Sequence, residues 1–399
     1  MTNSKNIPRR RFSGFDGEWE QRKLANIASM HARIGWQNLR TSEFLDNGDY
    51  YLITGTDFLS GRINFEKCHY VNKERYQQDK NIQVGEGSIL ITKDGTLGKV
   101  ALVTELNKPA TLNAGVFNVV VKDPSINETY LYQYLAAPFL MDYVFKRATG
   151  GTIKHLNQGI LVDFPIEIPS YKEQETIGQF LGCLDNAVTL HQHKLDKLKN
   201  LKKSYLAELF PAEGKRVPKR RFPGFEGEWE EKKLGEVVEK FDNLRIPVTS
   251  KDRIAGNIPY YGANGIQDYV KGFTHDGEFV LLAEDGANDL KDYPVQYVNG
   301  KVWVNNHAHV IQGKNNLIDN KFLLFAIKQI QMEPYLVGGG RAKLNAEIMM
   351  NLPLTAPGIS EQRMIGEFLM KVEKQLSLQQ EKLDKLKDLK KAYLNELFV

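Results

Sequence analysis

Two long segments of the chain occur twice, and this internal repeat constrains the fold more than any other feature. Residues 8–24 read PRRRFSGFDGEWEQRKL and residues 218–234 read PKRRFPGFEGEWEEKKL, with twelve of seventeen positions identical at an offset of 210. At an offset of 188, residues 194–210 (KLDKLKNLKKSYLAELF) match residues 382–398 (KLDKLKDLKKAYLNELF). Such self-similarity predicts two structurally equivalent halves.

The middle of each half is much less alike than its ends. The smaller offset still aligns Glu173-Gln174 with Glu361-Gln362. The two offsets differ by 22 residues, so this length difference lies between roughly residues 30 and 148. The ends of each half are near copies and are expected to form the same structural frame twice. The middles differ, so the two halves are expected to present two different binding surfaces.

Each half ends in a segment that has the pattern of a long helix. Residues 171–209 contain no proline, and apolar residues recur at alternating steps of four and three, as they do in the second half. This spacing is typical of a coiled coil, and a helix of this length would extend about 58 Å. The expected seam consists of Ile177, Leu181, Leu184, Val188, Leu195, Leu198, Ile365, Leu369, Val372, Leu376, Leu383 and Leu386.

The two helices are expected to pair antiparallel with each other, which would give the chain an internal pseudo-twofold axis. The many lysines of KLDKLKNLKK lie mostly off the seam. They fit a solvated helix face, and contact with DNA phosphates is the alternative.

The diverged middles indicate a mixed α+β domain in each half. Residues 85–103 read as two strands around the turn at Lys93-Asp94-Gly95, and residues 113–122 read as a third strand. Residues 130–146 read as a helix that Pro138 must bend or break. The second half repeats the scheme, with strands at 279–282 and 301–304 and a helix at 321–331.

The loops of both domains are rich in amide, hydroxyl and basic side chains, which pair with base edges and phosphates. These residue types also populate ordinary surface turns. Glycines at 150–151 and 338–340 precede basic residues, which suits either phosphate contact or a hinge. The candidate DNA-binding residues are Thr92, Lys93, Thr96, Lys99, Lys154, Asn264, Asn288, Lys291, Asn305, Asn306, Arg341 and Lys343.

Motifs for catalysis and for metal binding are missing from the sequence. There is no P-loop, no DPPY- or NPPF-type methyltransferase motif, and no paired-carboxylate nuclease pattern. The glycines of residues 12–17 do not follow a predicted strand. Cys68 and Cys183 lack ligand spacing and are expected to be free, buried thiols, and His191 and His193 point to different helix faces. We therefore expect no catalytic residue and no metal site.

Bulk properties add little about the partner. The formal net charge of +4 is too small to argue for nucleic acid by itself. Because the sequence has neither a secretory signal nor an apolar run of about 18 residues, a cytoplasmic protein is expected.

Taken together, the copied motifs make the chain resemble the specificity subunit of type I restriction–modification systems. The residues that carry the resemblance are two GFxGEWExxKL segments, two EQxxIGxFL segments and two KLDKLKxLKKxYLxELF segments. The resemblance covers essentially the whole chain. It implies an α+β fold with two target-recognition domains, separated by two long helices that form an antiparallel coiled coil. The expected boundaries are 1–168 for the first domain, 169–212 for the central helix, 213–356 for the second domain and 357–399 for the C-terminal helix.

The resemblance also implies a function. The chain would recognise a bipartite, asymmetric target on double-stranded DNA, and it would assemble with two methyltransferase subunits and two ATP-dependent restriction subunits. S-adenosylmethionine, ATP and magnesium would be bound by those partners, and this chain would hold no cofactor. Two alternatives stay open at this point: a fused or stand-alone DNA methyltransferase or nuclease with unrecognised motifs, and a coiled-coil assembly protein without DNA binding.

Overall fold

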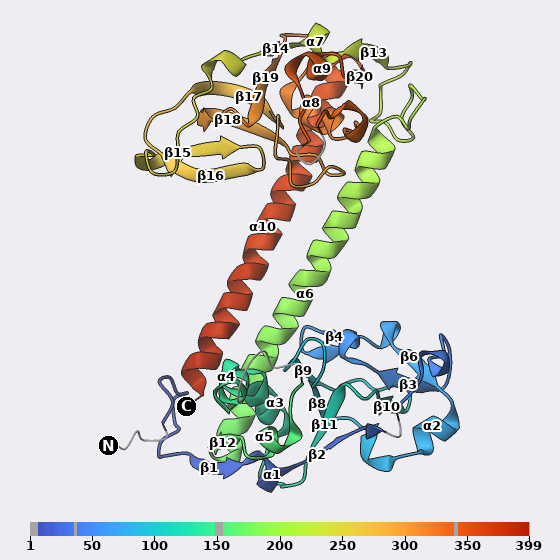
Figure 1. Cartoon of the computed structure of the whole chain (residues 1–399), viewed down its shortest axis with the longest axis vertical. Helices are drawn as coiled ribbons and strands as arrows, with labels where there is room; N and C mark the ends of the chain where they lie inside the picture. The colour runs from blue at the N-terminus through green and yellow to red at the C-terminus, as the bar shows by residue number, and fades with distance from the viewer. Residues whose placement is uncertain (1–6, 36–37, 148–154, 339–341, 399) are drawn as a thin grey trace. The chain divides into compact units, whose positions relative to one another are not determined.

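The computed structural model describes residues 7–35, 38–147, 155–338 and 342–398. The chain forms two compact units: unit 1 comprises residues 1–193 and 380–399, and unit 2 comprises residues 194–379. Each unit contains part of both long helices, α6 (Tyr171–Leu209) and α10 (Ile359–Leu397) (Figure 1).

Unit 1 is built on two four-stranded sheets. The central sheet has the order β2-β11-β8-β9, and the second sheet has the order β6-β3-β10-β7. The strands of the central sheet are β2 (Ala28–Ala32), β8 (Ile89–Thr92), β9 (Val100–Leu102) and β11 (Val116–Val121). The strands of the second sheet are β3 (Tyr50–Ile53), β6 (His69–Val71), β7 (Gln83–Val84) and β10 (Ala110–Leu112).

Smaller elements complete unit 1. Two short pairs, β1 with β12 and β4 with β5, are antiparallel. Their strands are β1 (Glu20–Lys23), β4 (Phe58–Leu59), β5 (Arg62–Ile63) and β12 (Pro165–Ile168). The helices are α1 (Leu24–Ile27), α2 (Lys73–Gln77), α3 (Glu128–Ala136), α4 (Pro138–Arg147) and α5 (Gln158–Val162).

Unit 2 has a single six-stranded sheet in the order β14-β19-β17-β18-β15-β16, and β13 pairs with β20. The strands are β13 (Glu230–Lys233), β14 (Val238–Lys240), β15 (Ala255–Gly262), β16 (Gly265–Val270), β17 (His275–Ala283), β18 (Val295–Val304), β19 (Ala308–Gly313) and β20 (Pro353–Ala356). The helices are α7 (Leu234–Val237), α8 (Asn320–Ile327) and α9 (Ala346–Met350). The order β14-β19-β17-β18 corresponds to β2-β11-β8-β9 of unit 1, so the mixed α+β fold expected in each half is confirmed.

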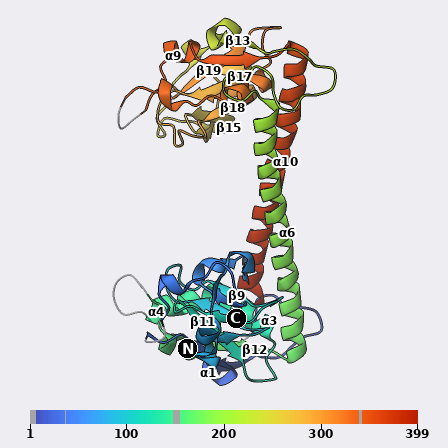
Figure 2. The same cartoon turned by 90° about the vertical axis from the view of Figure 1, so that its right-hand side faces the viewer.

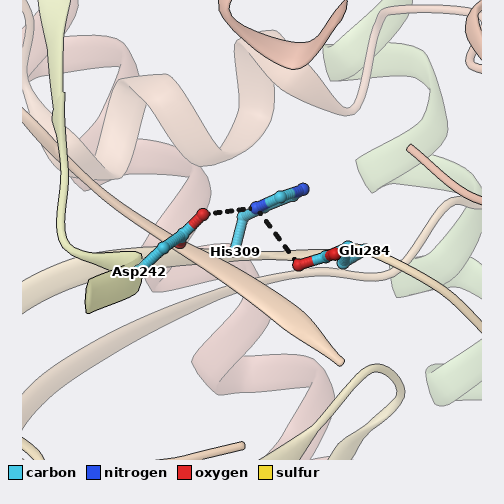
Figure 3. Close-up of side chains that lie close together, drawn as sticks. All are labelled: Asp242, Glu284 and His309. Atoms are coloured by element: carbon cyan, nitrogen blue, oxygen red, sulfur yellow. Dashed lines mark hydrogen bonds and ion pairs between the residues drawn. The ribbon is translucent and has the colours of Figure 1, made fainter. Parts of the chain in front are cut away.

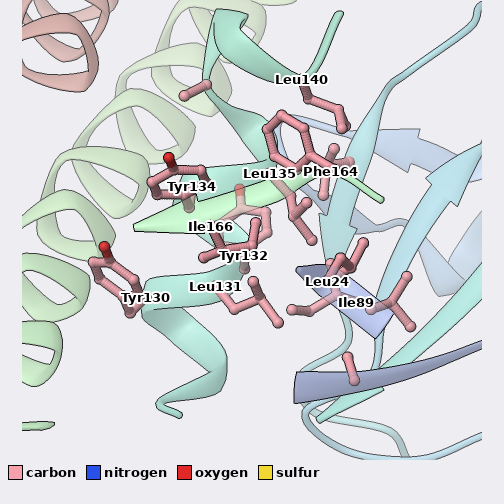
Figure 4. Close-up of a cluster of buried hydrophobic side chains, with 14 of the residues drawn as sticks. Leu24, Ile89, Tyr130, Leu131, Tyr132, Tyr134, Leu135, Leu140, Phe164 and Ile166 are labelled. Atoms are coloured by element: carbon pink, nitrogen blue, oxygen red, sulfur yellow. The ribbon is translucent and has the colours of Figure 1, made fainter. Parts of the chain in front are cut away.

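Apolar side chains explain why α3 lies between the central sheet and the long helices in unit 1. Tyr130, Leu131 and Leu135 point from different faces of α3, and all three are buried (Figure 4). The ring of Tyr130 packs against Phe398 at a centroid distance of 5.6 Å and against Trp19 at 6.3 Å. Such all-round burial is the pattern of a core helix.

Local sequence signals set several boundaries as expected. The strands around Lys93-Asp94-Gly95 and the strand within residues 113–122 are present, although a seven-residue loop connects the first two. Pro138 divides the helix expected at 130–146 into α3 and α4, with Ala137 extended between them. The helix expected at 321–331 ends earlier, at Ile327.

The copied RRF and EQ motifs bind each other in both units. Arg11 donates from Nε and Nη2 to the two carboxylate oxygens of Glu173, both at 2.8 Å. Arg221 makes the same bidentate pair with Glu361, at 2.8 and 2.7 Å. Each glutamate lies in the first turn of its long helix, where the helix dipole also favours a carboxylate. The repeated motif therefore fixes the start of each helix to the domain that precedes it.

The glutamine of each EQ motif holds the segment before the core helix. Gln174 accepts from the Asn127 N–H and donates to the carbonyls of Ser125 and Pro169. Gln362 makes the equivalent three bonds, with the Asp319 N–H and with the carbonyls of Leu317 and Pro357. The side-chain amides of Gln174 and Gln362 are both buried, and each makes the same three hydrogen bonds to the backbone in its unit.

The long helices lie side by side within each unit, and they are antiparallel (Figure 1 and Figure 2). In unit 1, Phe180 of α6 packs against Tyr393 of α10 at 4.8 Å, and Asp185 pairs with Lys390 at 2.5 Å. An early residue of one helix thus meets a late residue of the other.

Unit 2 contains the same contacts with the helices exchanged. Phe368 packs against Tyr205 at 4.8 Å, and Glu373 pairs with Lys202 at 2.5 Å. Each of these residues is related to its counterpart in unit 1 by the offset of 188. Lys202 and Lys390, which stand at positions of the seam spacing between apolar residues, are therefore ion-pair residues.

The twelve residues expected on the seam are all buried or half-buried. The fully buried ones are Ile177, Leu181, Val188, Leu195, Ile365, Leu369 and Leu383. Leu190, Leu201, Leu378 and Leu389 lie off the seam and are exposed.

Cys68 is buried and free, but Cys183 is exposed on α6, so the expectation of two buried thiols was wrong for Cys183. The proposed domain boundaries stay a prediction, because the compact units divide both long helices near their middles. Among the described residues, no helix has the length and apolarity needed to cross a membrane.

Candidate nucleic-acid interface

Three segments meet at one edge of the central sheet in unit 1. They are the loop Lys93–Lys99 after β8, the turn Asn113–Gly115 before β11, and the segment that begins at His155. The Lys93 N–H donates to the Gly115 carbonyl at 2.9 Å, and the Leu156 N–H donates to the Lys93 carbonyl at 2.8 Å. The candidate residues of this domain therefore belong to one continuous surface.

The same junction occurs in unit 2. The Glu284 N–H donates to the His307 carbonyl at 2.9 Å, and the Leu344 N–H donates to the Glu284 carbonyl at 2.7 Å. A further turn joins it, because the side chain of Asn264 binds the Gly286 carbonyl and the Asn288 N–H at 2.8 and 2.9 Å. Segments far apart in the sequence thus form one loop surface, as in unit 1.

Most candidate side chains lie on these two surfaces. The exposed ones are Thr96, Lys99, Asn264, Asn288, Lys291 and Asn306. Lys93 is half-buried over the ring of Phe117, and Lys343 is half-buried beside Glu284 at 2.9 Å. Lys154 and Arg341 lie outside the described residues.

Two candidates have a different role from the one expected. Thr92 is fully buried; its hydroxyl donates to the Thr96 carbonyl and accepts from the Lys99 N–H. Asn305 is buried, and its side chain accepts from the His307 N–H at 2.8 Å. Because neither side chain reaches the surface, each one holds its loop in shape instead of meeting a base.

A charge network around the buried His309 lies in unit 2 (Figure 3). The His309 Nδ1 atom is 2.7 Å from an Asp242 oxygen and 3.6 Å from a Glu284 oxygen, and its Nε2 atom is 2.9 Å from the Leu344 carbonyl. Arg245 donates to Glu284 at 2.7 Å. The network connects the start of the β17–β18 loop to β19 and to the segment at Leu344.

The carboxylates of this network are stabilised in their charged forms. Burial alone would raise the pKa of Asp242, but hydrogen bonds from His309 and from the Val310 N–H bring that pKa below its ordinary value. Burial likewise opposes ionisation of Glu284, and hydrogen bonds from Arg245 and Lys343 lower its pKa.

Asp242, Glu284 and His309 could also be considered as metal ligands, since one ligand atom from each lies within 4.8 Å of the others. However, Arg245 and Lys343 already occupy the two oxygens of Glu284 at 2.7 and 2.9 Å. Two fixed cations would repel a divalent ion at this place. The arrangement is that of an ion-pair network that fixes the loops.

Unit 1 also has a cleft where its domain meets the helices, with a volume of about 470 Å³. Lys99, Lys387 and Lys390 line it, and Asp185 neutralises Lys390. Neither of the other two ammonium groups has a carboxylate partner among the described residues. Two such cations on one cleft favour an anion such as a DNA phosphate.

One further feature was not among the candidates. In unit 1, His155 Nδ1 lies 2.5 Å from Asp94, and in unit 2, His307 Nδ1 lies 2.5 Å from Asp285. The two sites share a sequence signal, the Asp-Gly dipeptides at 94–95 and 285–286, but the histidines come from unrelated positions.

Comparison with known proteins adds a family match. The family described as type I restriction modification DNA specificity domain matches residues 16–200 and 226–388. A putative type I restriction enzyme specificity subunit of Haemophilus influenzae is 48% identical over 146 residues, which cover 37% of this chain and 37% of that protein. The EcoBI specificity subunit of Escherichia coli is 23% identical over 204 residues, covering 49% of this chain and 42% of that protein. The chain thus matches less than half the length of each of these relatives.

A solved structure shows the same fold. The crystal structure of a type I restriction-modification system S subunit from M. genitalium has a TM-score of 0.72 and 17% sequence identity, and the match covers 98% of this chain and 99% of that one. At this low identity, the likeness concerns the fold alone.

Proposed function

The chain belongs to the family of type I restriction modification DNA specificity domains, and on that premise we propose that it reads a bipartite, asymmetric DNA sequence, one half-site with each unit. We propose further that it contributes recognition and assembly while partner subunits carry out catalysis.

One observation carries the proposal: the two units share a frame and differ in the loops that the frame presents. The frame includes the bidentate arginine–glutamate pairs, the glutamine contacts and the four-strand order of the central sheet. The loops differ in residues and in length, with Thr96 and Lys99 exposed in unit 1 and Asn264, Asn288 and Asn306 exposed in unit 2. Different side chains on equivalent surfaces suit two different half-sites.

The partners in the proposal are two methyltransferase subunits and two ATP-dependent restriction subunits. Each unit leaves one leucine of each long helix exposed: Leu190 and Leu389 in unit 1, and Leu201 and Leu378 in unit 2. The offset of 188 relates these residues across the units. Exposed leucines at equivalent positions of the two units support two copies of one partner, each of which would bury the leucines of one unit. S-adenosylmethionine, ATP and magnesium would be held by the partners.

Coexpression with a cognate methyltransferase tests the proposal. We expect genome-wide adenine methylation at one bipartite motif, and no methylation by the purified chain alone. Replacing residues 30–148 with the corresponding segment of another such protein should change one half of the motif and leave the other half unchanged. Methylation by the chain alone, or methylation without sequence dependence, would contradict the proposal.

A further inference from the structure

The aspartate–histidine pairs occupy the same place in both units, and we propose that His155 and His307 read bases, one in each half-site. Each imidazole accepts a hydrogen bond from the exocyclic amino group of an adenine or a cytosine, and Asp94 and Asp285 orient the rings. This inference rests on the proposed function and names a specificity residue for each unit.

The aspartates belong to the copied frame. Asp94 is the second residue after β8, and Asp285 is the second residue after β17, the equivalent strand. The neighbouring backbone bonds are also the same, because Leu156 and Leu344 bind the carbonyls of the residues directly before these aspartates. Asp94 and Asp285 therefore occupy equivalent positions in the two units.

The histidines, in contrast, reach the two aspartates from different positions. His307 directly precedes β19, where unit 1 has Gly115 before β11. His155 directly precedes Leu156, where unit 2 has Lys343 before Leu344. A Cβ atom on Gly115 would lie 3.7 Å from the Asp94 Cβ, so this glycine occupies the place next to the aspartate that His307 takes in unit 2.

This exchange argues against a pair that is merely part of the frame. If the contact only stabilised the fold, both members would be expected at equivalent positions, as Arg11–Glu173 and Arg221–Glu361 are. Here only the aspartate is duplicated, and the imidazole comes from a different segment in each unit. That difference is what two readers of unlike half-sites require.

The chemistry of the pair determines what the ring offers. A carboxylate only accepts hydrogen bonds, so Nδ1 carries the hydrogen, and when the ring is neutral its Nε2 atom has a free lone pair. Within the described part of the chain, Nε2 of neither histidine has a hydrogen-bond partner. The side chains of His155 and His307 are 77% and 39% exposed, so both are accessible to a ligand.

A neutral acceptor selects among DNA groups. Phosphate oxygens also only accept, so they cannot bind Nε2 in this state. The major groove offers two donors, the N6 amino group of adenine and the N4 amino group of cytosine. The expected contact is therefore with a base and not with the backbone.

The test uses the whole chain coexpressed with its methyltransferase, with adenine methylation mapped over the genome. We expect His155→Ala to lower discrimination at one base position of one half-site by about ten- to a hundredfold. His307→Ala should do the same in the other half-site. Methylation at all other motif positions should keep its wild-type specificity.

The orienting aspartates are positioning residues, and their variants provide a second readout. In Asp94→Asn and Asp285→Asn, the new amide can donate to Nδ1, which reverses the tautomer and makes Nε2 a donor. The preferred base at the affected position should then shift toward guanine or thymine, whose major-groove edges offer oxygen acceptors. A loss of folding cannot produce such a change of preference.

Matched controls come from histidines away from the loops. His69 lies near Asp46 at 3.9 Å in unit 1, and His193 is exposed on α6. His69→Ala and His193→Ala should leave the motif unchanged, and thermal unfolding should show that all variants fold. An unchanged motif in both His155→Ala and His307→Ala, or a uniform loss of methylation with no change of motif, would overturn the inference and leave the proposed function standing. If the wild-type chain gives no bipartite motif, the proposed function and this inference fail together.

Discussion

At the scale of single residues, Arg11 and Arg221 explain why the RRF and EQ motifs are identical in the two halves. Each binds a glutamate that is 1 or 2% exposed, and each also donates to the carbonyl of a nearby glycine, Gly17 or Gly227. Hydrogen bonding to Glu173, opposed by burial, raises the pKa of Arg11 above its ordinary value, and Glu361 has the same effect on Arg221. Lysine could not make this two-pronged contact, because it lacks the planar fork of the guanidinium.

Removal of either arginine should therefore destabilise its unit. We expect Arg11→Ala to lower the free energy of unfolding by about 3 kcal/mol, because it leaves a buried carboxylate without its cation. Arg221→Ala should have a similar effect on unit 2. Urea unfolding followed by circular dichroism measures both values. The control is Lys23→Ala, which breaks the exposed pair with Asp163 and should cause no measurable loss. Equal stability of Arg11→Ala and the wild type would contradict this account.

At the scale of elements, a glycine in each long helix lets a second helix approach closely. A Cβ atom on Gly366 would lie 2.7 Å from the Phe322 backbone nitrogen in α8. A Cβ atom on Gly178 would lie 3.1 Å from the Tyr130 nitrogen in α3. The IG pair of the copied EQxxIGxFL motif is thus explained by packing: the isoleucine is buried on the seam, and the glycine makes room for the core helix of the adjoining domain.

These contacts predict an order of stability for three alanine variants. Gly366→Ala should destabilise most, by about 1–3 kcal/mol, because backbone atoms cannot yield to the added methyl group. Gly178→Ala should cost less, since its contacts are longer. Gly182 has nothing within 4 Å of its would-be Cβ, so Gly182→Ala should stabilise α6 by up to about 1 kcal/mol. Thermal unfolding of the three variants tests the order; a stabilised Gly366→Ala variant would refute the packing argument.

At the scale of the whole molecule, the two copies of the arginine-rich segment contact the ends of the two long helices in the same way. The segment at Arg10 contacts the end of α10, and the segment at Arg220 contacts the end of α6. In unit 1, the Arg10 N–H donates to the Glu396 carbonyl at 2.9 Å, and the side chains pair at 2.6 Å. In unit 2, Arg220 makes the same contacts with Glu208, at 2.8 and 2.6 Å. In unit 2, residues 211–217 join these two copied segments covalently.

A circular permutation should consequently preserve both units. Phe398 would be joined to Pro8 through a copy of residues 211–217, and the chain would be opened between Glu213 and Gly214. We expect wild-type secondary structure and the same methylated motif on coexpression with the methyltransferase, because Glu213 and Gly214 are both exposed and the opening falls within a local turn. As a control, opening the chain within α6 at Leu195 should abolish folding, since that residue is buried on the seam. An insoluble first variant would show that the connection in unit 2 does more than join two ends.

The sequence alone determined the features that depend on copied or periodic residues. The two halves, the bounds of α6, the burial of the seam and the strands on either side of the β8–β9 loop follow from repetition, from a spacing of 3.5 residues and from runs of β-branched residues. These patterns involve residues that are close in the chain or copied within it, so the order of the residues is enough to reveal them. The second sheet of unit 1 was not anticipated, because its strands are two to four residues long and the pairing of β3 with β10 joins segments far apart in the chain. The β15–β16 pair of unit 2 is a local hairpin, but its strands, AGNIPYYG and GIQDYV, lack a regular alternation of apolar and polar residues.

Tertiary structure decided which polar side chains face outward. Thr92 and Asn305 have the composition of base-reading residues, yet both are buried and hold loops, because burial depends on what packs over a residue and not on its type. The histidine partners of Asp94 and Asp285 could not be found from the sequence for a related reason: His155 and Asp94 are 61 residues apart, and His307 meets Asp285 from another segment. The repeat therefore revealed that the chain has two equivalent frames, whereas only the folded chain shows which side chains each frame presents.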